Sequence, residues 1–426
     1  MRAGTIAIVA TLVLVAPAGN RTEAATIALA CGAVGTEFQF CQDGARAWAA
    51  ETGNEVRIVS TPNSATERLS FFQLLLAFGS ADVDVFQIDL IWSGLLGPHF
   101  LDLTEHFDPG EIEAFYPSLV ENATADGRLV GIPWFADAGL LYYRTDLLDK
   151  YGYQVPKTWA ELADMAERIQ KEERAAGQDR MQGIVFQASA YEGLTCNALE
   201  WIDSNGGGSI VEPDGTISVD NPRVTEVIDE VATWIGGIAP TGVLSYTEEE
   251  SRGVFQSGNA VFMRNWPYAW ALANAEDSPI KGKVGIAALP AWTDGGSPTS
   301  VLGGSELSVS RYSMHVPEAV DLVRYLTSRA EQKRRAIEAS FNPTIQDLYQ
   351  DPDILEASPF VSDLRASFDN AAPRPTKATG LAYTQVSSAF FNAVHSVLSG
   401  SERAEPAFAD LRSRLEWLSR RWQPEG

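Results

Sequence analysis

Thr26-Ile-Ala-Leu-Ala30, Glu55-Val-Arg-Ile-Val59 and Asp84-Val-Phe-Gln-Ile88 are three short β-rich runs near the start of the chain. Amphipathic segments near residues 37–52 and 66–79 separate them, and each is long enough for a helix. Strands that alternate with helices of this length predict βαβ units and a parallel sheet with helices on both faces. This part of the chain is therefore expected to form an α/β lobe.

Later β-rich runs indicate a second sheet, or strands that cross between two sheets. They are Gly183–Phe186, Asn259–Met263, Lys283–Ala288 and Leu307–Ser310. From Pro317 onward the pattern is almost entirely helical, and it ends in the periodic stretch Glu402–Trp422. Glycine- and proline-rich loops punctuate the chain, but no low-complexity linker divides it. Two α/β lobes joined by more than one crossing are predicted, with crossings near Pro133–Gly139 and Gly285–Pro290.

The chain is strongly acidic. Its 426 residues include 32 Lys and Arg against 56 Asp and Glu, a formal net charge of −24. Such a surface repels phosphate backbones and anionic lipid heads, which argues against nucleic-acid-binding and peripheral-membrane roles. Only three cysteines and four histidines are present, which argues against a Cys/His metal site. No metal and no cofactor are predicted.

Residues 1–18, MRAGTIAIVATLVLVAPA, have the pattern of a secretory signal peptide. Arg2 lies near the start, a short apolar run follows, and Ala16-Pro-Ala18 forms a small-residue exit. A transmembrane anchor would need about 20 apolar residues, and this run is shorter. The mature protein is therefore expected to be soluble and exported, to the periplasm or another extracytoplasmic compartment.

After export, Cys31 and Cys41 would lie in an oxidising compartment, where a disulfide is allowed. Cys31 follows the first strand and Cys41 lies early in the next helix, a spacing that could bring them within bonding reach. Two buried free thiols fit the sequence about as well. Cys31 lies far beyond the apolar run, which argues against lipid attachment there. Cys196 is expected to be a small core residue.

Enzyme motifs are scarce in this sequence. No nucleophile motif surrounds any histidine, and the G-x-S-x-G, G-x-G-x-x-G and G-x-x-x-x-G-K-S/T patterns do not occur. Paired carboxylates for sugar hydrolysis have no fixed spacing, so a secreted glycoside hydrolase stays open as an alternative function.

Aromatic residues cluster in Asn265-Trp-Pro-Tyr-Ala-Trp270, within a chain that has eleven tryptophans. Pro267 suits the first turn of a helix, which would place Trp266 at its mouth beside a strand end. An indole there can lie against the C–H face of a sugar while polar side chains bind the hydroxyls. Composition alone favours the alternative that these are core aromatics. Asp89 and Asp137 are similarly ambiguous, because an acidic residue after a strand can be a helix cap or a ligand-binding group.

Several longer motifs resemble one protein family. They are Gly131-Ile-Pro-Trp-Phe-Ala-Asp-Ala-Gly-Leu-Leu-Tyr-Tyr-Arg-Thr-Asp-Leu-Leu148, Lys150-Tyr-Gly152, Pro156-Lys-Thr-Trp159, Arg264-Asn-Trp-Pro-Tyr-Ala-Trp270, Asp277-Ser-Pro-Ile-Lys-Gly-Lys-Val284 and Ala372-Pro-Arg-Pro375. Over nearly all of the mature chain, the sequence is similar to the family 1 extracellular solute-binding proteins of ABC importers. Within that family it most resembles the trehalose/maltose-binding branch.

The resemblance implies an α/β periplasmic-binding-protein fold of the maltose-binding type, with a ligand cleft between two hinged lobes. We expect the N-terminal lobe to comprise residues 26–137 and 290–340. The C-terminal lobe is expected to comprise residues 138–289 and 341–426. No chemistry on the ligand is implied.

The resemblance also implies which residues bind the sugar. It implies that the acidic Glu37, the hydroxyl of Ser64 and the basic Arg68 and Arg374 contact the sugar. It implies that Asp89 and Asp137 accept sugar hydroxyl protons as ionised carboxylates. It also implies that Trp266 and Tyr268 stack on the sugar and that the backbone approaches it closely at Gly303 and Gly304.

Two positions depart from the pattern of the branch. Phe135 replaces a usual Tyr, and Ser305-Glu306 replaces a pair that begins with Trp. Because side chains alternate along a strand, only one of Ser305 and Glu306 is expected to line the site.

The leading hypothesis is a monomeric, exported receptor that captures an α-linked disaccharide or related glycoside and presents it to the membrane permease of an ABC importer. The glycoside hydrolase is the main alternative, and a surface adhesin is a third. An adhesin would need an exposed aromatic patch rather than a cleft.

Overall fold

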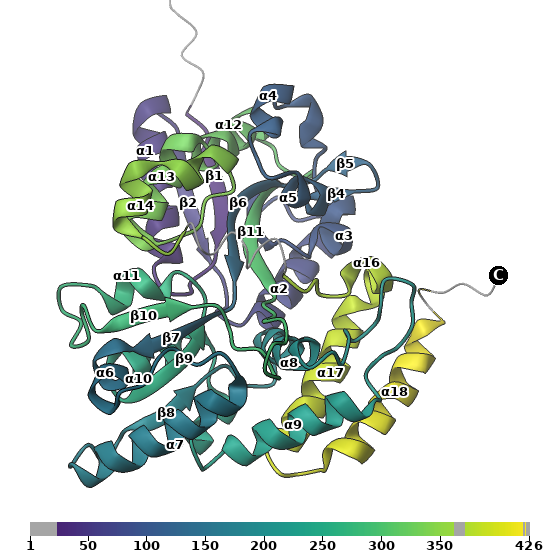
Figure 1. Ribbon diagram of the computed structural model, residues 1–426. Helices are drawn as coiled ribbons and strands as arrows, with labels where there is room; N and C mark the ends of the chain where they lie inside the picture. The colour runs from purple at the N-terminus through teal and green to yellow at the C-terminus, as the bar shows by residue number, and fades with distance from the viewer. Residues whose placement is uncertain (1–23, 362–370, 421, 423–426) are drawn as a thin grey trace, which may run out of the picture.

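The computed structural model describes residues 24–361, 371–420 and 422, which form the two lobes seen at the top and bottom of Figure 1. The first lobe is built on a sheet with strand order β2-β1-β3-β11-β6. Its strands are β1 (Thr26–Cys31), β2 (Glu55–Ser60), β3 (Val85–Asp89), β6 (Ile132–Ala138) and β11 (Leu302–Val309). β1 pairs in parallel with β2 and β3, as the predicted βαβ units require. β11 runs antiparallel to β3 and β6.

Helices α1 (Glu37–Thr52) and α2 (Ala65–Ala77) connect the first three strands. Ser64 caps α2 by accepting a hydrogen bond from the Glu67 N–H, and Gly53 ends α1 in the left-handed conformation. Both helices begin at the edge of the sheet where the parallel strands end, which is the ligand-binding edge of α/β proteins. The other elements of this lobe are α3 (Ser93–Leu96), α4 (Pro109–Glu113), α5 (Pro117–Asn122), β4 (Thr124–Ala125), β5 (Arg128–Leu129), α12 (Val316–Leu326), α13 (Arg329–Ala339) and α14 (Pro352–Ala357).

The second lobe is built on a sheet with strand order β10-β7-β9-β8. Its strands are β7 (Leu140–Arg144), β8 (Gln182–Val185), β9 (Ala260–Asn265) and β10 (Val284–Ala287). Its helices are α6 (Thr145–Tyr151), α7 (Trp159–Ala175), α8 (Glu192–Ser204), α9 (Pro222–Trp234), α10 (Glu248–Gln256), α11 (Ala269–Ala273), α17 (Tyr383–Leu398) and α18 (Ala404–Ser419), with the short α16 (Thr376–Thr379) ahead of α17. α8, α9, α17 and α18 pack together around a core of branched aliphatic and aromatic side chains.

The chain crosses between the two sheets at Gly139, which separates β6 from β7, as the sequence predicts. A Cβ atom at this position would lie 2.1 Å from Glu200 Oε1, so the crossing requires glycine. A second crossing precedes β11, where the Ser300 hydroxyl donates to the Gly139 carbonyl at 2.7 Å. The prediction of a crossing at Gly285–Pro290 is wrong, because β10 lies within the second sheet. The run predicted at Leu307–Ser310 overlaps the end of β11, which stops at Val309 and lies in the first sheet.

Residues 341–361 pack with the first lobe, which differs from the expected boundary at residue 340. Phe341, Leu348 and Ile354 join a hydrophobic core that contains the α12 and α13 side chains. The Gln346 N–H donates to the Ala114 carbonyl at 3.0 Å, which ties this segment to the chain after α4. A helical pattern in the sequence does not indicate which sheet the helix covers. The periodicity therefore could not predict that the first lobe extends to residue 361.

Cys31 and Cys41 form a disulfide between the end of β1 and the first turns of α1, and Cys196 is buried as a free thiol. The predicted signal peptide at residues 1–18 lies outside the described residues. Within the part of the chain that the structure describes, no helix has the length and apolar character needed to cross a membrane.

Candidate functional site

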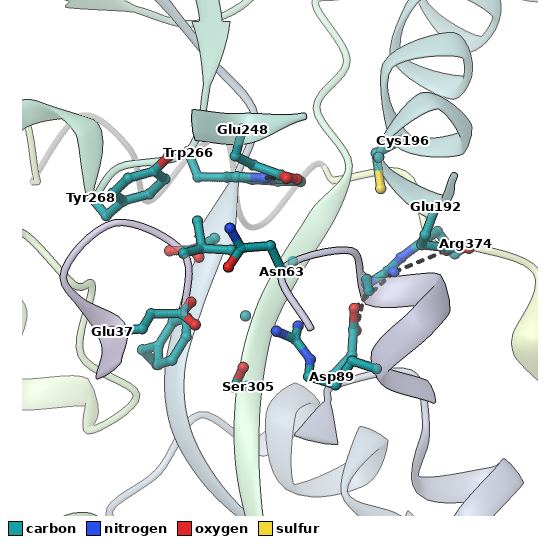
Figure 2. Close-up of a pocket in the computed structure, with 18 residues that line it drawn as sticks. Glu37, Asn63, Asp89, Glu192, Cys196, Glu248, Trp266, Tyr268, Ser305 and Arg374 are labelled. Atoms are coloured by element: carbon teal, nitrogen blue, oxygen red, sulfur yellow. Dashed lines mark hydrogen bonds and ion pairs between the residues drawn. The ribbon is translucent and has the colours of Figure 1, made fainter. Parts of the chain in front are cut away.

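A pocket lies between the two lobes, at the end of the first sheet where α1 and α2 begin (Figure 2). It encloses about 600 Å³, with the open space at its mouth included, a size typical of small-molecule sites. Trp266, Tyr268 and Glu248 form one wall, and Glu37, Ser305 and Asp89 face them across the pocket. Side chains from both lobes therefore surround the same space.

Trp266 follows β9 and presents an indole to the pocket. Behind it, the Arg264 guanidinium lies 3.9 Å from the centre of the indole ring, a distance at which a cation is attracted to the ring face. Arg264 is itself held by Glu200, with Nε 2.8 Å from Oε2. The indole Nε1 donates to Glu248 Oε1 at 3.4 Å. The ring is therefore fixed at its back and its edge, while it remains partly exposed toward the pocket.

Tyr268 is buried beside Trp266, and its hydroxyl donates to Glu249 Oε1 at 2.7 Å. Burial, reinforced by the negative charge of Glu249, raises the pKa of the Tyr268 phenol well above its usual value. Gly35 approaches this ring so closely that a Cβ atom there would lie 2.4 Å from it. The loop before α1 in the first lobe thus packs against the second lobe at Tyr268.

Acidic side chains from the first lobe face this aromatic wall. Glu37, in the first turn of α1, accepts a hydrogen bond from Gln87 Nε2 at 3.4 Å. Burial raises the pKa of Glu37, and the nearby Arg68 guanidinium opposes that rise. Arg68 is buried, and its Nε and Nη1 atoms have no hydrogen-bond partner among the described residues. The hydrogen-bonding capacity of these two nitrogens is therefore unused by the described residues.

Asp137 lies on β6 with its Oδ1 buried and without a hydrogen-bond partner among the residues described. Burial raises its pKa to about 8, the negative charge of Glu37 adds to the rise, and Arg335 and Arg264 oppose it. A pKa of about 8 favours the protonated carboxyl at neutral pH. The expectation that Asp137 binds sugar hydroxyls as an ionised carboxylate stays a prediction, and the burial of the carboxyl away from water opposes that ionisation.

Asp89 ends β3 and forms a two-pronged ion pair with Arg374, at 2.6 Å and 3.0 Å. Arg374 Nη1 also donates to Glu192 Oε1 at 3.1 Å, and Nη2 donates to the Leu302 carbonyl at 3.2 Å. Because Asp89 belongs to the first lobe and Glu192 begins α8 of the second, Arg374 links the lobes. Most of its donors are already used, which leaves Nε as its unpartnered group among the described residues.

Gly303 and Gly304 bring β11 close to the pocket. A Cβ atom at Gly303 would lie 3.1 Å from the Trp266 ring, and one at Gly304 would lie 2.3 Å from the Phe135 carbonyl oxygen. Gly304 has φ 120°, a conformation that side chains rarely adopt. Ser305 lines the pocket and accepts a hydrogen bond from Gln87 Nε2 at 3.1 Å. Glu306 does not line the pocket and is bonded to the Ser93 hydroxyl, so the two side chains separate as strand alternation predicts.

The structure brings together all of the expected ligand-binding residues except Ser64. Ser64 caps α2, and its neighbours Asn63 and Ala65 line the pocket instead. Residues that the sequence reasoning missed are Val34, Asn63, Ala65, Glu192, Gly193, Cys196 and Glu248. Glu192 and Glu248 each begin a helix, and an acidic residue in a first turn is so common that it carries no signal for a ligand.

Comparison with known proteins agrees with this geometry. The family model described as bacterial extracellular solute-binding protein matches residues 32–333. The chain belongs to this family. The expected family is thereby confirmed.

Two similar proteins align with 93% of this chain. A probable ABC transporter-binding protein of Deinococcus radiodurans is 50% identical over 399 residues, which cover 93% of this chain and 94% of that protein. The maltose-bound structure of T. maritima MalE3 has a TM-score of 0.88 and 39% identity, and the match covers 93% of this chain and all of that one. The GacH receptor of Streptomyces glaucescens, 21% identical, shares the fold with a TM-score of 0.81. The two-lobe fold of the maltose-binding type is confirmed.

Asp137 should make the stability of this solute-binding protein depend on pH. Its ordinary pKa is 3.8 and its folded value is about 8, so between these values the folded protein holds a proton that the unfolded chain releases. The free energy of unfolding then falls as pH rises, by at most about 1.4 kcal/mol per pH unit from this group. In urea titrations, Asp137→Asn should gain stability relative to the wild type between pH 5 and pH 7.5. A difference that stays constant with pH would contradict the assignment.

Proposed function

We propose that this solute-binding protein is the extracytoplasmic sugar-binding component of an ABC importer, and that it captures an α-linked disaccharide or related glycoside without altering it. The ligand in the T. maritima MalE3 structure is maltose, and a Bacillus subtilis relative, 24% identical, is named a maltodextrin-binding protein. These names support a glycoside. The signal-peptide pattern of residues 1–18 and the family's extracellular location support export and delivery to a permease.

The observation that carries the proposal is the indole of Trp266 facing buried polar groups across the pocket. A sugar ring has apolar C–H faces and hydroxyls around its edge, so it needs a flat aromatic surface and directed hydrogen-bonding groups. Trp266 supplies the first. Arg68 donors, the Asp137 carboxyl and the Glu37 carboxyl supply the second, since each has bonding capacity that the protein leaves unused or only weakly used. Hydrogen bonds from the Arg68 guanidinium would be charge-assisted, which makes them stronger than neutral ones.

Ligand binding should favour closure of the lobes, because the ligand would touch both walls at once. A ligand stabilises the conformation to which it binds better, and only the closed form offers Trp266 and Glu37 to the same sugar. We propose hinges at the crossings near Gly139 and Ser300–Leu302, with the first lobe extending to residue 361. A single chain supplies both walls, so a monomer suffices for binding.

A thermal-shift screen over about fifty mono-, di- and oligosaccharides tests the function, because a ligand that binds only the folded state raises the melting temperature. We expect at least one α-linked glycoside to stabilise the protein, and small-angle scattering should show compaction at saturation. Product analysis should detect no released monosaccharide. Release of monosaccharide that Asn at Asp89 or Asp137 abolishes would favour a glycoside hydrolase, and no stabilisation by any sugar would overturn the proposal.

Trp266→Ala should weaken binding of the sugar found in that screen by about 2 kcal/mol or more, as loss of a buried aromatic anchor does. Calorimetry would measure the affinity. Trp417→Ala is the matched control, because Trp417 is an exposed tryptophan on α18 and does not line the pocket. If Trp266→Ala folds and binds as tightly as the control, Trp266 is not the stacking platform.

Ser305 should make one subsite roomier and more polar than in the trehalose/maltose branch. Loss of an indole removes a large apolar contact, while the Ser305 hydroxyl keeps its proton for a ligand because its oxygen accepts from Gln87. We therefore propose a substituted or differently linked glycoside as the better ligand, with weak binding of trehalose and maltose.

Ser305→Trp should shift preference back toward the plain disaccharides. We expect affinity for maltose or trehalose, relative to the best ligand of the wild type, to rise about tenfold, which is about 1.4 kcal/mol. Ser305→Ala serves as the control for loss of the hydroxyl alone. Submicromolar binding of maltose or trehalose by the wild type, with nothing tighter in the screen, would refute this assignment.

A further inference from the structure

Gln87 is a buried side chain that contacts three parts of the pocket wall without lining the pocket itself. It lies on β3, two residues before Asp89, so both side chains are on the same face of the sheet. Its Oε1 accepts from the Gly32 N–H at 2.7 Å. Its Nε2 donates to Ser305 Oγ at 3.1 Å and to Glu37 Oε2 at 3.4 Å. One side-chain amide therefore connects β3 to β11, to α1 and to the loop before α1.

The Gly32 N–H determines which end of this amide faces each neighbour. A backbone N–H can only donate, so Gln87 must turn its oxygen toward Gly32 and its NH2 group toward Ser305 and Glu37. The NH2 group carries two hydrogens, and each of them has an acceptor. The close approach requires glycine, because a Cβ atom at Gly32 would lie 2.0 Å from Glu37 Oε2 and 3.1 Å from Gln87 Nε2.

The peptide unit between Cys31 and Gly32 is held from both sides. Its carbonyl oxygen accepts from the Thr61 hydroxyl at 2.6 Å, and its N–H donates to Gln87. Cys31 is also joined to Cys41 on α1 by the disulfide. Rotation of this peptide would break both hydrogen bonds, so the backbone fixes the orientation of the Gln87 amide.

The orientation of the amide decides how two pocket-lining groups can meet a ligand. Ser305 Oγ accepts from Gln87, so the hydroxyl proton of Ser305 is left to donate into the pocket. Glu37 is held by the same NH2 group through Oε2, and this contact does not use Oε1. Gln87 thus turns Ser305 into a donor and Glu37 into an acceptor on the same side of the pocket.

We propose that Gln87 is a positioning residue for sugar binding, which fixes the Ser305 hydroxyl as a donor to a sugar oxygen and orients the Glu37 carboxyl beside it. The inference rests on the proposed function, and it assigns to Gln87 no contact with the ligand. It also narrows the ligand class. An ether oxygen can accept a hydrogen bond as a hydroxyl oxygen does, so the Ser305 subsite admits a glycosidic or alkylated oxygen.

Gln87→Met keeps a side chain of similar length and removes all three hydrogen bonds. In calorimetry with maltose and with the strongest sugar from the screen, it should bind about tenfold more weakly than the wild type, because it leaves buried polar groups unpaired. Gln87→Glu keeps an acceptor for Gly32 and has at most one hydrogen to donate, so its affinity should lie between the two. It also provides the comparison if methionine prevents folding. Wild-type affinity in both folded variants would overturn the proposal.

Gln170→Met is the matched control. Gln170 is a buried glutamine on α7 that accepts from the Gly183 N–H at 2.6 Å and donates to the Gly237 carbonyl at 3.0 Å, but it does not line or contact the pocket. Its replacement should lower stability and leave sugar affinity unchanged. An equal loss of affinity in Gln170→Met would show that removal of any buried glutamine weakens binding, and would contradict a specific role for Gln87.

A double-mutant cycle with Ser305→Ala tests whether Gln87 acts through Ser305. Because contacting residues couple, the loss caused by Gln87→Met should be at least about threefold smaller in the Ser305→Ala background than in the wild type. A loss of the same size in both backgrounds would mean that Gln87 only supports the fold.

Crystal structures of the sugar-free wild type and Gln87→Met give a readout that does not need a ligand. We expect the Ser305 and Glu37 side chains to change position when the amide is removed. Unchanged positions of both side chains would overturn the proposal. If the wild type binds no sugar in the screen, the proposed function fails, and these structures still decide whether Gln87 positions the two groups.

Discussion

The buried ion pair between Arg264 and Glu200 is the interaction on which the pocket depends. Both side chains are 1% exposed. Glu200 also accepts the Val301 N–H at 3.2 Å, next to the crossing that leads into β11. At the crossing between β6 and β7, Gly139 has no side chain, and this leaves room for the Arg264 and Glu200 side chains. The pocket-lining indole of Trp266 and both connections between the lobes therefore contact the same ion pair.

This shared support gives the buried ion pair a structural role beyond any contribution to stability. A buried ion pair often costs about as much desolvation as it recovers in attraction, but removal of one partner leaves an uncompensated charge and is strongly destabilising. Here the pair also supports an aromatic ring, because the Arg264 guanidinium carbon lies 3.9 Å from the Trp266 ring centre and Gln187 Oε1 accepts from Arg264 Nη1 at 3.2 Å. A binding surface that must meet a sugar at fixed geometry benefits from such rigidity.

Some charged side chains around the pocket have their hydrogen-bonding atoms paired within the protein, and others keep unpartnered atoms among the described residues. Arg374 is almost fully used by Asp89 and Glu192, and Glu192 is further held by Ser387 at 2.6 Å and by Tyr383. Arg68 and Asp137, by contrast, keep unpartnered atoms in the same space. Arg374 with its two acids links the lobes, whereas Arg68 and Asp137 keep polar atoms that no described residue uses.

The sequence by itself determined the local elements, the family and most of the pocket. The alternation of strands and helices in residues 26–89 depends on residues that are close in the sequence. The motif around Trp266 and the glycines of β11 are also short, continuous stretches, so the sequence alone reveals them. Tertiary structure decided what depends on distant neighbours. The strand pattern allowed β11 in the second sheet or at a crossing, whereas the expected lobe of residues 290–340 placed it with the first sheet, where it pairs with β3 and β6. Residues 341–361 joined the first lobe because their apolar faces meet α13 and the chain after α4. The raised pKa of Asp137 arises from burial, and burial is a property of the packed chain rather than of any stretch of sequence.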